Sequence, residues 1–209
     1  FINKKTVFDQ QLSDTWIGSA FLTSDQAVQI NDYFSKHPLF NWGDIHNCED
    51  RAEAISILLT QWQIPHFKAW VFSGYFLSRN MGSLKNKWNY HVAIMLPTLL
   101  ESGPSAMVLD PTHSTTLETI EHWANTVTLD AQSHYLVKQG HIYIFPVGQI
   151  RNENWHHRNR QNYKWTMQGL AGINGVSTKG KAEVTFNKFK ITRTIKAFQT
   201  LQRNNPFSF

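Results

Sequence analysis

Cysteine is nearly absent from this sequence: Cys48 is the only one among 209 residues. A single cysteine excludes an intramolecular disulfide framework and a zinc site built from paired cysteines. Long apolar runs are missing too, because HVAIMLPTLL, the longest candidate, contains a proline and is shorter than the roughly 18 residues of a membrane span. We therefore expect no membrane span, and Cys48 is a buried hydrophobe, an intermolecular link, a metal ligand or a nucleophile.

Acidic residues are scarce in the C-terminal third, where only Glu153 and Glu183 follow residue 137. The formal net charge is +5, and much of the positive excess lies in this region. Its basic residues alternate with Trp, Phe and Ile and form no RNA- or DNA-binding motif, which predicts a solvated basic surface and no nucleic-acid partner. The length, the apolar content and the absence of repeats predict a single domain over residues 1–209. We also expect a monomer.

The apolar pattern predicts two helices in the N-terminal part of the chain, followed by the strands of a sheet. Thr23 and Gln26 have capping-box spacing at the start of the first expected helix, and the second is marked by apolar residues at helical spacing. Aromatic and β-branched runs between turn residues then predict strands. Helices are expected over 23–36, 48–62, 116–127 and 192–203, and strands over 66–77, 88–96, 106–111 and 141–147. This order predicts an α+β fold with an antiparallel sheet.

Cys48 lies in the first turn of the expected helix 48–62, behind two residues, Asp44 and Asn47, that can cap it. Backbone N–H groups at a helix start have no partner in the helix, and the dipole is positive there. Both features stabilise a thiolate, so the position predicts a reactive nucleophile with a lowered pKa.

A cysteine nucleophile needs a base and a group that orients the base. His91 and Asp110 supply these residue types on the expected strands 88–96 and 106–111. If these strands are neighbours, the two side chains lie side by side. Taken alone, each residue is more often structural: His91 as a sheet histidine with its hydrogen bonds made, and Asp110 as a turn residue before proline. The prediction of a Cys-His-Asp triad therefore depends on the three residues occurring together.

Four short motifs resemble the protein-glutaminase (protein-glutamine deamidase) family, whose core is similar to that of transglutaminases and other papain-like enzymes. They are NCEDRA at 47–52, KAWVF at 68–72, WNYHVAIML at 88–96 and VLDPTH at 108–113. The resemblance covers residues 23–127 as a catalytic core and leaves 128–209 as a C-terminal extension of the sheet with a basic surface. It implies a papain/transglutaminase-like α+β fold, with the catalytic cysteine at a helix N-terminus packed on an antiparallel sheet.

The same resemblance implies roles for individual residues. Cys48 is the expected nucleophile, His91 the general base and acid, and Asp110 the residue that orients His91. The expected partner is a protein or peptide that contains glutamine, and no cofactor or metal is expected. Hydrolysis of a glutamine amide through a Cys48 thioester gives glutamate and ammonia. A lysine amine in place of water would make the same site a transglutaminase, and attack on a backbone amide would make it a cysteine peptidase.

Other residues are candidates for supporting roles. The backbone N–H of Cys48 is the expected oxyanion donor, because the helix start directs it toward the nucleophile, with Asn47 or a Trp N–H as a second donor. Trp42 and Trp88 are candidates for substrate binding. Trp42, Trp62, Trp70 and Trp88 are alternatively core residues, which is the commoner role at their spacing.

The sequence contains two further histidine sites that are alternatives. His113 lies close to Asp110 in sequence and is an alternative base to His91. His156 and His157 are adjacent, but neighbouring residues of a strand point to opposite faces and no HExxH or paired-cysteine spacing accompanies them, which disfavours a metal site.

A function of a different class stays open at this point: a non-catalytic protein-binding module that keeps the fold and uses its basic, aromatic C-terminal third. For an enzyme, we expect either a secreted digestive deamidase or a translocated effector that alters one target. The lack of disulfides fits both and favours a bacterial product that tolerates a reducing compartment. The first residue is Phe1, which leaves open whether a signal peptide was removed.

Overall fold

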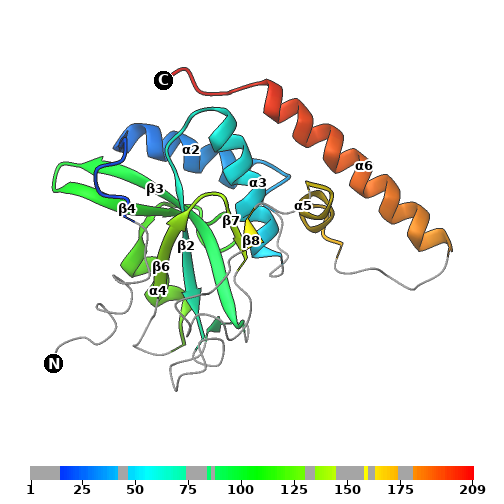
Figure 1. The fold of residues 1–209 in the computed structure, drawn as a ribbon, viewed down its shortest axis with the longest axis horizontal. Coiled ribbons are helices and arrows are strands. Elements are labelled where there is room, and N and C mark those ends of the chain that lie inside the picture. Colours follow the sequence, from blue (N-terminus) through cyan, green and yellow to red (C-terminus); the bar gives the residue numbers. More distant parts are fainter. Residues whose placement is uncertain are drawn as a thin grey trace.

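A central sheet carries helices on both of its faces (Figure 1). The computed structural model describes residues 15–41, 47–73, 84–85, 88–129, 135–144, 158–159, 163–173 and 181–209. The sheet has the strand order β5-β4-β3-β2-β6, with antiparallel neighbours throughout, and short β1 pairs in parallel with β3. The strands are β1 (Leu22–Thr23), β2 (Phe67–Phe72), β3 (Tyr90–Leu100), β4 (Gly103–Leu109), β5 (Glu118–Thr119) and β6 (Tyr135–Gln139). The predicted α+β class with an antiparallel sheet is confirmed.

Helix α2 (Ser24–Lys36) starts with the predicted capping box. Thr23 Oγ1 accepts a hydrogen bond from the Gln26 N–H at 3.2 Å, and Gln26 Oε1 accepts one from the Thr23 N–H at 2.9 Å. These two bonds satisfy N–H groups that have no partner inside the helix. The helix buries Ile30 and Phe34.

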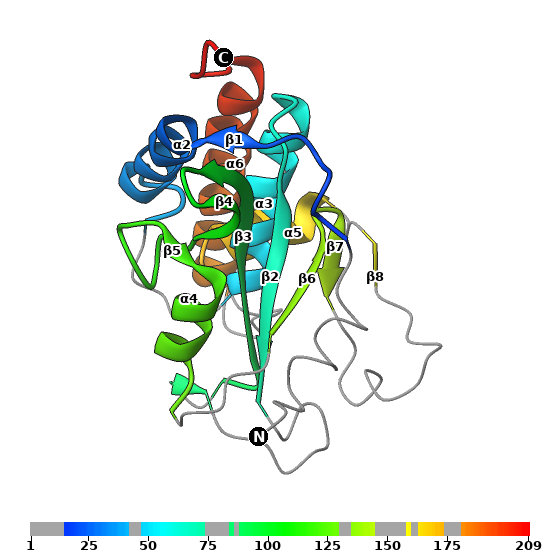
Figure 2. The same cartoon turned by 90° about the vertical axis from the view of Figure 1, so that its left-hand side faces the viewer.

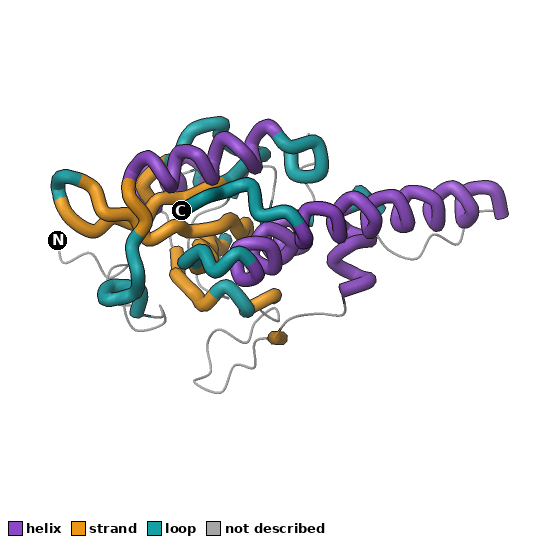
Figure 3. The backbone as a smooth tube through the Cα atoms, turned by 90° about the horizontal axis from the view of Figure 1, so that it is seen from above, coloured by secondary structure: helices purple, strands orange, loops and turns teal. Residues whose placement is uncertain are grey.

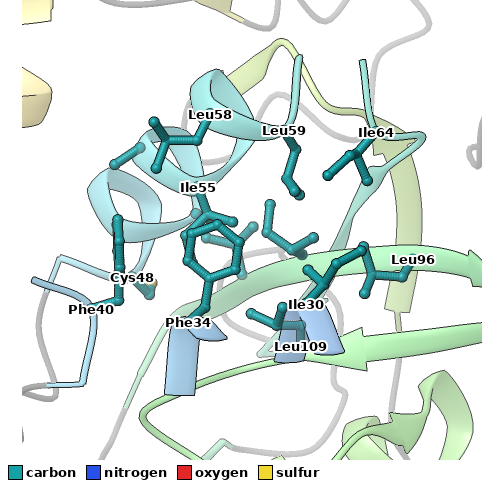
Figure 4. Packing of buried hydrophobic residues seen from close by; sticks show 14 of the residues in the cluster. Ile30, Phe34, Phe40, Cys48, Ile55, Leu58, Leu59, Ile64, Leu96 and Leu109 are labelled. Atoms are coloured by element: carbon teal, nitrogen blue, oxygen red, sulfur yellow. The ribbon is translucent and has the colours of Figure 1, made fainter. Parts of the chain in front are cut away.

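Helix α3 (Cys48–Gln61) lies beside α2 on one face of the sheet. In Figure 4, Cys48 and Ile55 of α3 lie in the same apolar cluster as Phe34 of α2 and Leu109 of β4. Strand β3 contributes its even-numbered residues to this cluster and its odd-numbered ones to the other face, as a two-residue period requires. The predicted helix behind Cys48 is confirmed.

Helix α4 (Ile120–Val127) packs on the opposite face, where Figure 2 shows it across the sheet from α3. A helix was predicted from residue 116, but Glu118 and Thr119 form β5 and pair with β4. Thr119 Oγ1 accepts a hydrogen bond from the His122 N–H at 3.3 Å and so caps the helix later than the apolar pattern indicated.

The strand boundaries differ from those predicted from sequence. Strand β3 continues through Pro97 to Leu100, whereas the prediction ended it at residue 96. A proline is tolerated there because the pairing of β2 with β3 stops at Met95, so no β2 acceptor lies opposite Pro97. Strand β4 begins at Gly103 and ends at Leu109, which leaves Asp110 just beyond the strand.

The C-terminal part contains elements that the sequence pattern did not indicate. Strand β6 adds to the sheet, and β7 (Ile142–Ile144), which lies within the predicted strand 141–147, pairs separately with β8 (Arg158–Asn159), which was not predicted. Helix α5 (Tyr163–Leu170) was not predicted, and α6 (Lys181–Arg203) starts well before the predicted residue 192. Figure 3 shows α6 extending past the sheet, and among the described residues no helix is long and apolar enough to cross a membrane.

A buried ion pair joins α3 to the sheet. Lys68 of β2 and Glu53 of α3 are both fully buried, with 2.6 Å between Lys68 Nζ and Glu53 Oε2. Lys68 Nζ also donates to the Ile142 carbonyl oxygen at 2.7 Å, which connects β7 to the same point. Removing one partner would leave the other charge buried without its counterion, which is far more costly than losing an exposed pair.

We expect Lys68→Met to lower the free energy of unfolding by about 3–5 kcal/mol, measured by urea denaturation. Lys36→Met is the matched control, because Lys36 forms an exposed i,i+4 pair with Asp32 at 2.7 Å and should lose less than about 1 kcal/mol. The double variant Lys68→Met with Glu53→Leu should recover part of the loss, since it leaves no buried charge. Equal effects of Lys68→Met and Lys36→Met would show that the buried pair does not anchor α3.

Candidate active site

His91 and Asp110 meet because β3 and β4 are neighbours. The register pairs Ile94 with Leu109, so the residue after β4 lies beside the start of β3. His91 Nε2 and Asp110 Oδ2 are 2.6 Å apart, and both side chains are almost fully buried. The predicted side-by-side placement of these residues is therefore confirmed.

The Asp110 carboxyl has two further donors. Trp123 Nε1 of α4 donates to Oδ2 at 3.0 Å, and Thr112 Oγ1 donates to Oδ1 at 3.0 Å. Burial raises the pKa of Asp110, but the charge and hydrogen bond of His91 and the Trp123 N–H outweigh it. The net effect holds the pKa of this carboxyl below its ordinary value. At neutral pH Asp110 is therefore ionised, and it accepts hydrogen bonds without donating any.

His91 is held in one orientation. Since Asp110 only accepts hydrogen bonds, the proton between the two groups is assigned to His91 Nε2, which leaves Nδ1 with its lone pair. Nδ1 is buried, and it has no hydrogen-bond partner among the described residues. The ring stacks on Trp88, with centroids 4.4 Å apart and planes 14° apart, and the Trp123 ring lies 5.9 Å away. The imidazole thus presents one free basic nitrogen.

Cys48 is the first residue of α3 and lies against the same end of β3. Its sulfur accepts a hydrogen bond from the backbone N–H of Val92, the residue after His91. Its thiol also donates to Glu49 Oε2 at 3.4 Å. The side chain is 9% exposed. The sulfur therefore lies at the backbone of the residue that follows His91 in β3.

The expected thiolate is not what the structure favours in the free protein. Burial, followed by the charge of Glu49, raises the pKa of the Cys48 thiol well above its ordinary value. The Val92 N–H and the Arg51 charge act in the opposite direction and are weaker. The sequence-based prediction of a lowered pKa was therefore wrong, because it counted the helix start and not the desolvation of the sulfur.

The turn before α3 is shaped by Asn47. This residue has φ 62°, in the left-handed region that asparagine tolerates better than most residues, and its side chain makes no capping hydrogen bond. Instead, Asn47 Nδ2 donates to the Gly169 carbonyl oxygen of α5 at 3.3 Å. The prediction that its side chain caps the helix was wrong, and Asp44, the other predicted cap, lies outside the described residues.

A small cavity of about 10 Å³ joins the cysteine to the aspartate. Its lining includes Cys48 and Arg51 of α3, Val92 of β3, and Asp110 with Pro111 after β4. A cavity of this size holds roughly one water molecule. The space between Cys48 and Asp110, as these lining residues enclose it, is thus too small for a glutamine side chain.

The tryptophans divide between the core and the site. Trp62 and Trp70 are buried in the apolar cluster around α3, as their spacing indicated, whereas Trp88 is half-buried and covers His91. Trp42, the other candidate for substrate binding, lies outside the described residues. Trp88 thus contacts His91 and also packs against the apolar cluster on the α4 side of the sheet.

The alternative histidines are not brought to the thiol by any observed contact. His113 Nε2 is hydrogen-bonded to Thr126 Oγ1 of α4 at 2.8 Å, so its ring faces α4. His156 and His157 lie outside the described residues. Within the described part of the chain, no group of three or more His, Cys, Asp or Glu side chains could hold a metal ion.

Sequence reasoning missed three residues that hold the site. Trp123 donates to Asp110, and Arg51 Nη1 donates to Thr112 Oγ1 at 3.5 Å, so that α3 is connected to Asp110 through Thr112. Arg51 and Thr112 stand inside the quoted motifs NCEDRA and VLDPTH, which was a usable signal. Trp123 had no such signal in the sequence, because an aromatic residue on an amphipathic helix is typical of the hydrophobic core.

Comparison with known proteins identifies a family and a shared fold. Residues 21–127, more than half of the chain, match the family model described as Glutaminase. A crystal structure of protein-glutaminase is similar with a TM-score of 0.56 and 18% identity, covering 78% of this chain and 98% of the other. A crystal structure of pro-protein-glutaminase has a TM-score of 0.51 and 17% identity, covering 83% and 68%. No protein with a curated description matches this sequence.

The two structural matches show a shared fold, and the family match extends over Cys48, His91 and Asp110. This chain belongs to the glutaminase family.

Proposed function

We propose that this chain is a protein-glutamine deamidase, which hydrolyses the side-chain amide of protein-bound glutamine to glutamate and ammonia. The match to the glutaminase family over residues 21–127 carries this proposal, because that range contains Cys48, His91 and Asp110. The 2.6 Å hydrogen bond between His91 and Asp110 supports it, since it gives the histidine the tautomer that a base beside a thiol needs.

In the first half of the reaction, Cys48 Sγ attacks the side-chain carbonyl carbon of glutamine. The thiol proton passes to His91 Nδ1, whose lone pair is free because Nε2 keeps the proton shared with Asp110. The developing oxyanion is stabilised by the backbone N–H of Cys48, which has no acceptor within the helix. His91 then returns the proton to the nitrogen, the C–N bond breaks, and ammonia leaves a thioester on Cys48.

In the second half, water attacks the thioester carbon and gives a proton to His91 Nδ1. The C–S bond breaks, glutamate is released, and the proton returns to the sulfur. Each proton that His91 gains is offset by the charge of Asp110, whose pKa stays low in this environment. The two tryptophan rings beside His91 shield the imidazolium from water, and a cation over an aromatic face is attracted to it.

Cys48→Ser should lower deamidation by at least about 10³-fold, because the change is nearly isosteric and the hydroxyl is a far weaker nucleophile. Ammonia release and intact mass of a glutamine-rich protein measure the effect. His113→Ala is the matched control and should keep near-wild-type activity, since His113 faces Thr126. Undiminished ammonia release in Cys48→Ser would remove Cys48 from the mechanism.

The same assay separates the neighbouring reaction types when a primary amine is added. Ammonia release with no amine adduct and no cleavage supports a deamidase. Amine adducts would indicate a transglutaminase, and cleaved chains a peptidase. A wild-type protein that leaves a panel of glutamine-containing proteins unchanged would contradict the proposed function.

The raised thiol pKa predicts slow alkylation of the free protein. Cys48 is the only cysteine, so one iodoacetamide adduct by mass spectrometry reports it alone. A raised pKa means that the thiolate forms only above the ordinary pH range of cysteine. We therefore expect a rate at pH 7 well below that of free cysteine, rising steeply at alkaline pH. Rapid alkylation at pH 7 would show instead that His91 already holds the thiol proton.

Asp110→Asn should lower kcat by about 10²–10⁴-fold. An asparagine can present its N–H₂ to His91 Nε2, which moves the imidazole proton to Nδ1 and leaves no lone pair toward the thiol. Steady-state ammonia release measures kcat, and Asp32→Asn, an exposed carboxyl on α2, is the control. A wild-type kcat in Asp110→Asn would assign the orientation of His91 to another group.

A further inference from the structure

Glu49 contacts the nucleophile and has no part in the mechanism derived above. It follows Cys48 in the first turn of α3 and is half-buried, with Oε2 3.4 Å from Cys48 Sγ. The next acidic residue, Asp50, points elsewhere: its carboxyl accepts a hydrogen bond from Tyr143 of β7 and packs on Gly169 of α5. Of the two acidic residues in this turn, Glu49 is the one at the sulfur.

Tyr90 fixes the position of the Glu49 carboxyl from the opposite side. This residue opens β3, immediately before His91, and its hydroxyl is hydrogen-bonded to Glu49. Burial of the Tyr90 hydroxyl, together with the nearby charge of Glu49, raises the pKa of Tyr90, so the hydroxyl remains a donor. The carboxyl is therefore held between the Cys48 thiol and the Tyr90 hydroxyl, next to the sulfur.

We propose, on the basis of the proposed function, that Glu49 determines specificity by accepting an N–H hydrogen bond from the side-chain amide of the substrate glutamine. A carboxamide at the sulfur has its nitrogen one bond from the attacked carbon, within hydrogen-bond reach of an oxygen 3.4 Å from Sγ. The amide brings two N–H donors and the carboxylate only accepts, so the pair is complementary. The thiol gives up its contact with Glu49 when substrate enters.

The product, glutamate, cannot form this hydrogen bond and is repelled by Glu49. Glutamate lacks N–H donors on its side chain, and its carboxylate would face the Glu49 carboxylate at close range. Two carboxylates in a partly buried site repel each other, which favours release of product. Glu49 therefore selects the amide over the acid at the same position. It equally selects the amide over an ester, which has the same reactive carbon and no N–H.

The experiment compares two substrates that differ only in that N–H₂ group. One is a peptide with a single glutamine, and the other is the same peptide with glutamate γ-methyl ester in its place. The measured quantity is the ratio of kcat/KM for the amide to kcat/KM for the ester. Removing Glu49 also changes the thiol pKa, but that change acts on both substrates and cancels in the ratio.

Glu49→Ala should lower the amide-to-ester ratio by about 10- to 100-fold, the range for a hydrogen bond to a charged group. Glu49→Gln should lower it less, since its carbonyl oxygen still accepts. In both variants the glutamate product peptide should inhibit more strongly than in the wild type. Glu101→Gln, in the exposed turn between β3 and β4, is the control and should leave the ratio unchanged.

An unchanged ratio in Glu49→Ala, with equal losses on both substrates, would overturn the proposal and leave Glu49 a structural neighbour of the thiol. Circular dichroism of each variant, and the ester rate itself, separate misfolding from loss of selectivity. The proposed function is judged independently, on the wild type: failure to release ammonia from the glutamine peptide would contradict the deamidase assignment and this proposal together. An intact wild-type rate with an unchanged variant ratio would contradict the Glu49 proposal alone.

Discussion

The buried carboxyl of Asp110 is the group on which the geometry of the site depends. A buried carboxylate is costly unless hydrogen-bonded, and this one receives donors from three places: His91 of β3, Trp123 of α4 and Thr112 of its own turn. Any slip of β3 against β4, or of α4 against the sheet, would leave the charge unpaired. The register of the sheet and the orientation of His91 are therefore fixed by the same hydrogen bonds.

Cys48 is held on the face of the sheet that α3 covers. The sulfur of Cys48 contacts the Val92 N–H, while Arg51, in the same turn of α3, donates to Thr112 and thus reaches the Asp110 turn. The helix that carries Cys48 is therefore connected to His91 by one hydrogen-bond network, although α3 and α4 cover opposite faces of the sheet. In this arrangement the thiol is desolvated, which raises its pKa above the ordinary value for cysteine.

The sequence predicted what depends on local pattern and on the order of residue types. It predicted the capping box of α2, the helix behind Cys48, the antiparallel sheet and the contact between His91 and Asp110. It missed what depends on tertiary contacts: the raised thiol pKa, the indole that donates to Asp110, helix α5, and the early start of α6. Burial of a sulfur by distant residues leaves no local signature. The single domain, the monomer and the secretion or translocation expected from the sequence stay predictions.

The C-terminal region supports the site even though the family match ends at residue 127. Gly169 of α5 accepts the Asn47 side chain through its carbonyl oxygen, and a Cβ at this position would overlap the Asp50 carboxyl. Only glycine allows α5 to approach the first turn of α3 so closely. Burial raises the pKa of Asp50 to about 7, partly offset by the hydrogen bond from Tyr143 of β7, so this carboxyl is readily protonated near neutral pH. The start of α3 is thus held in part by elements that follow the residues matched by the family model.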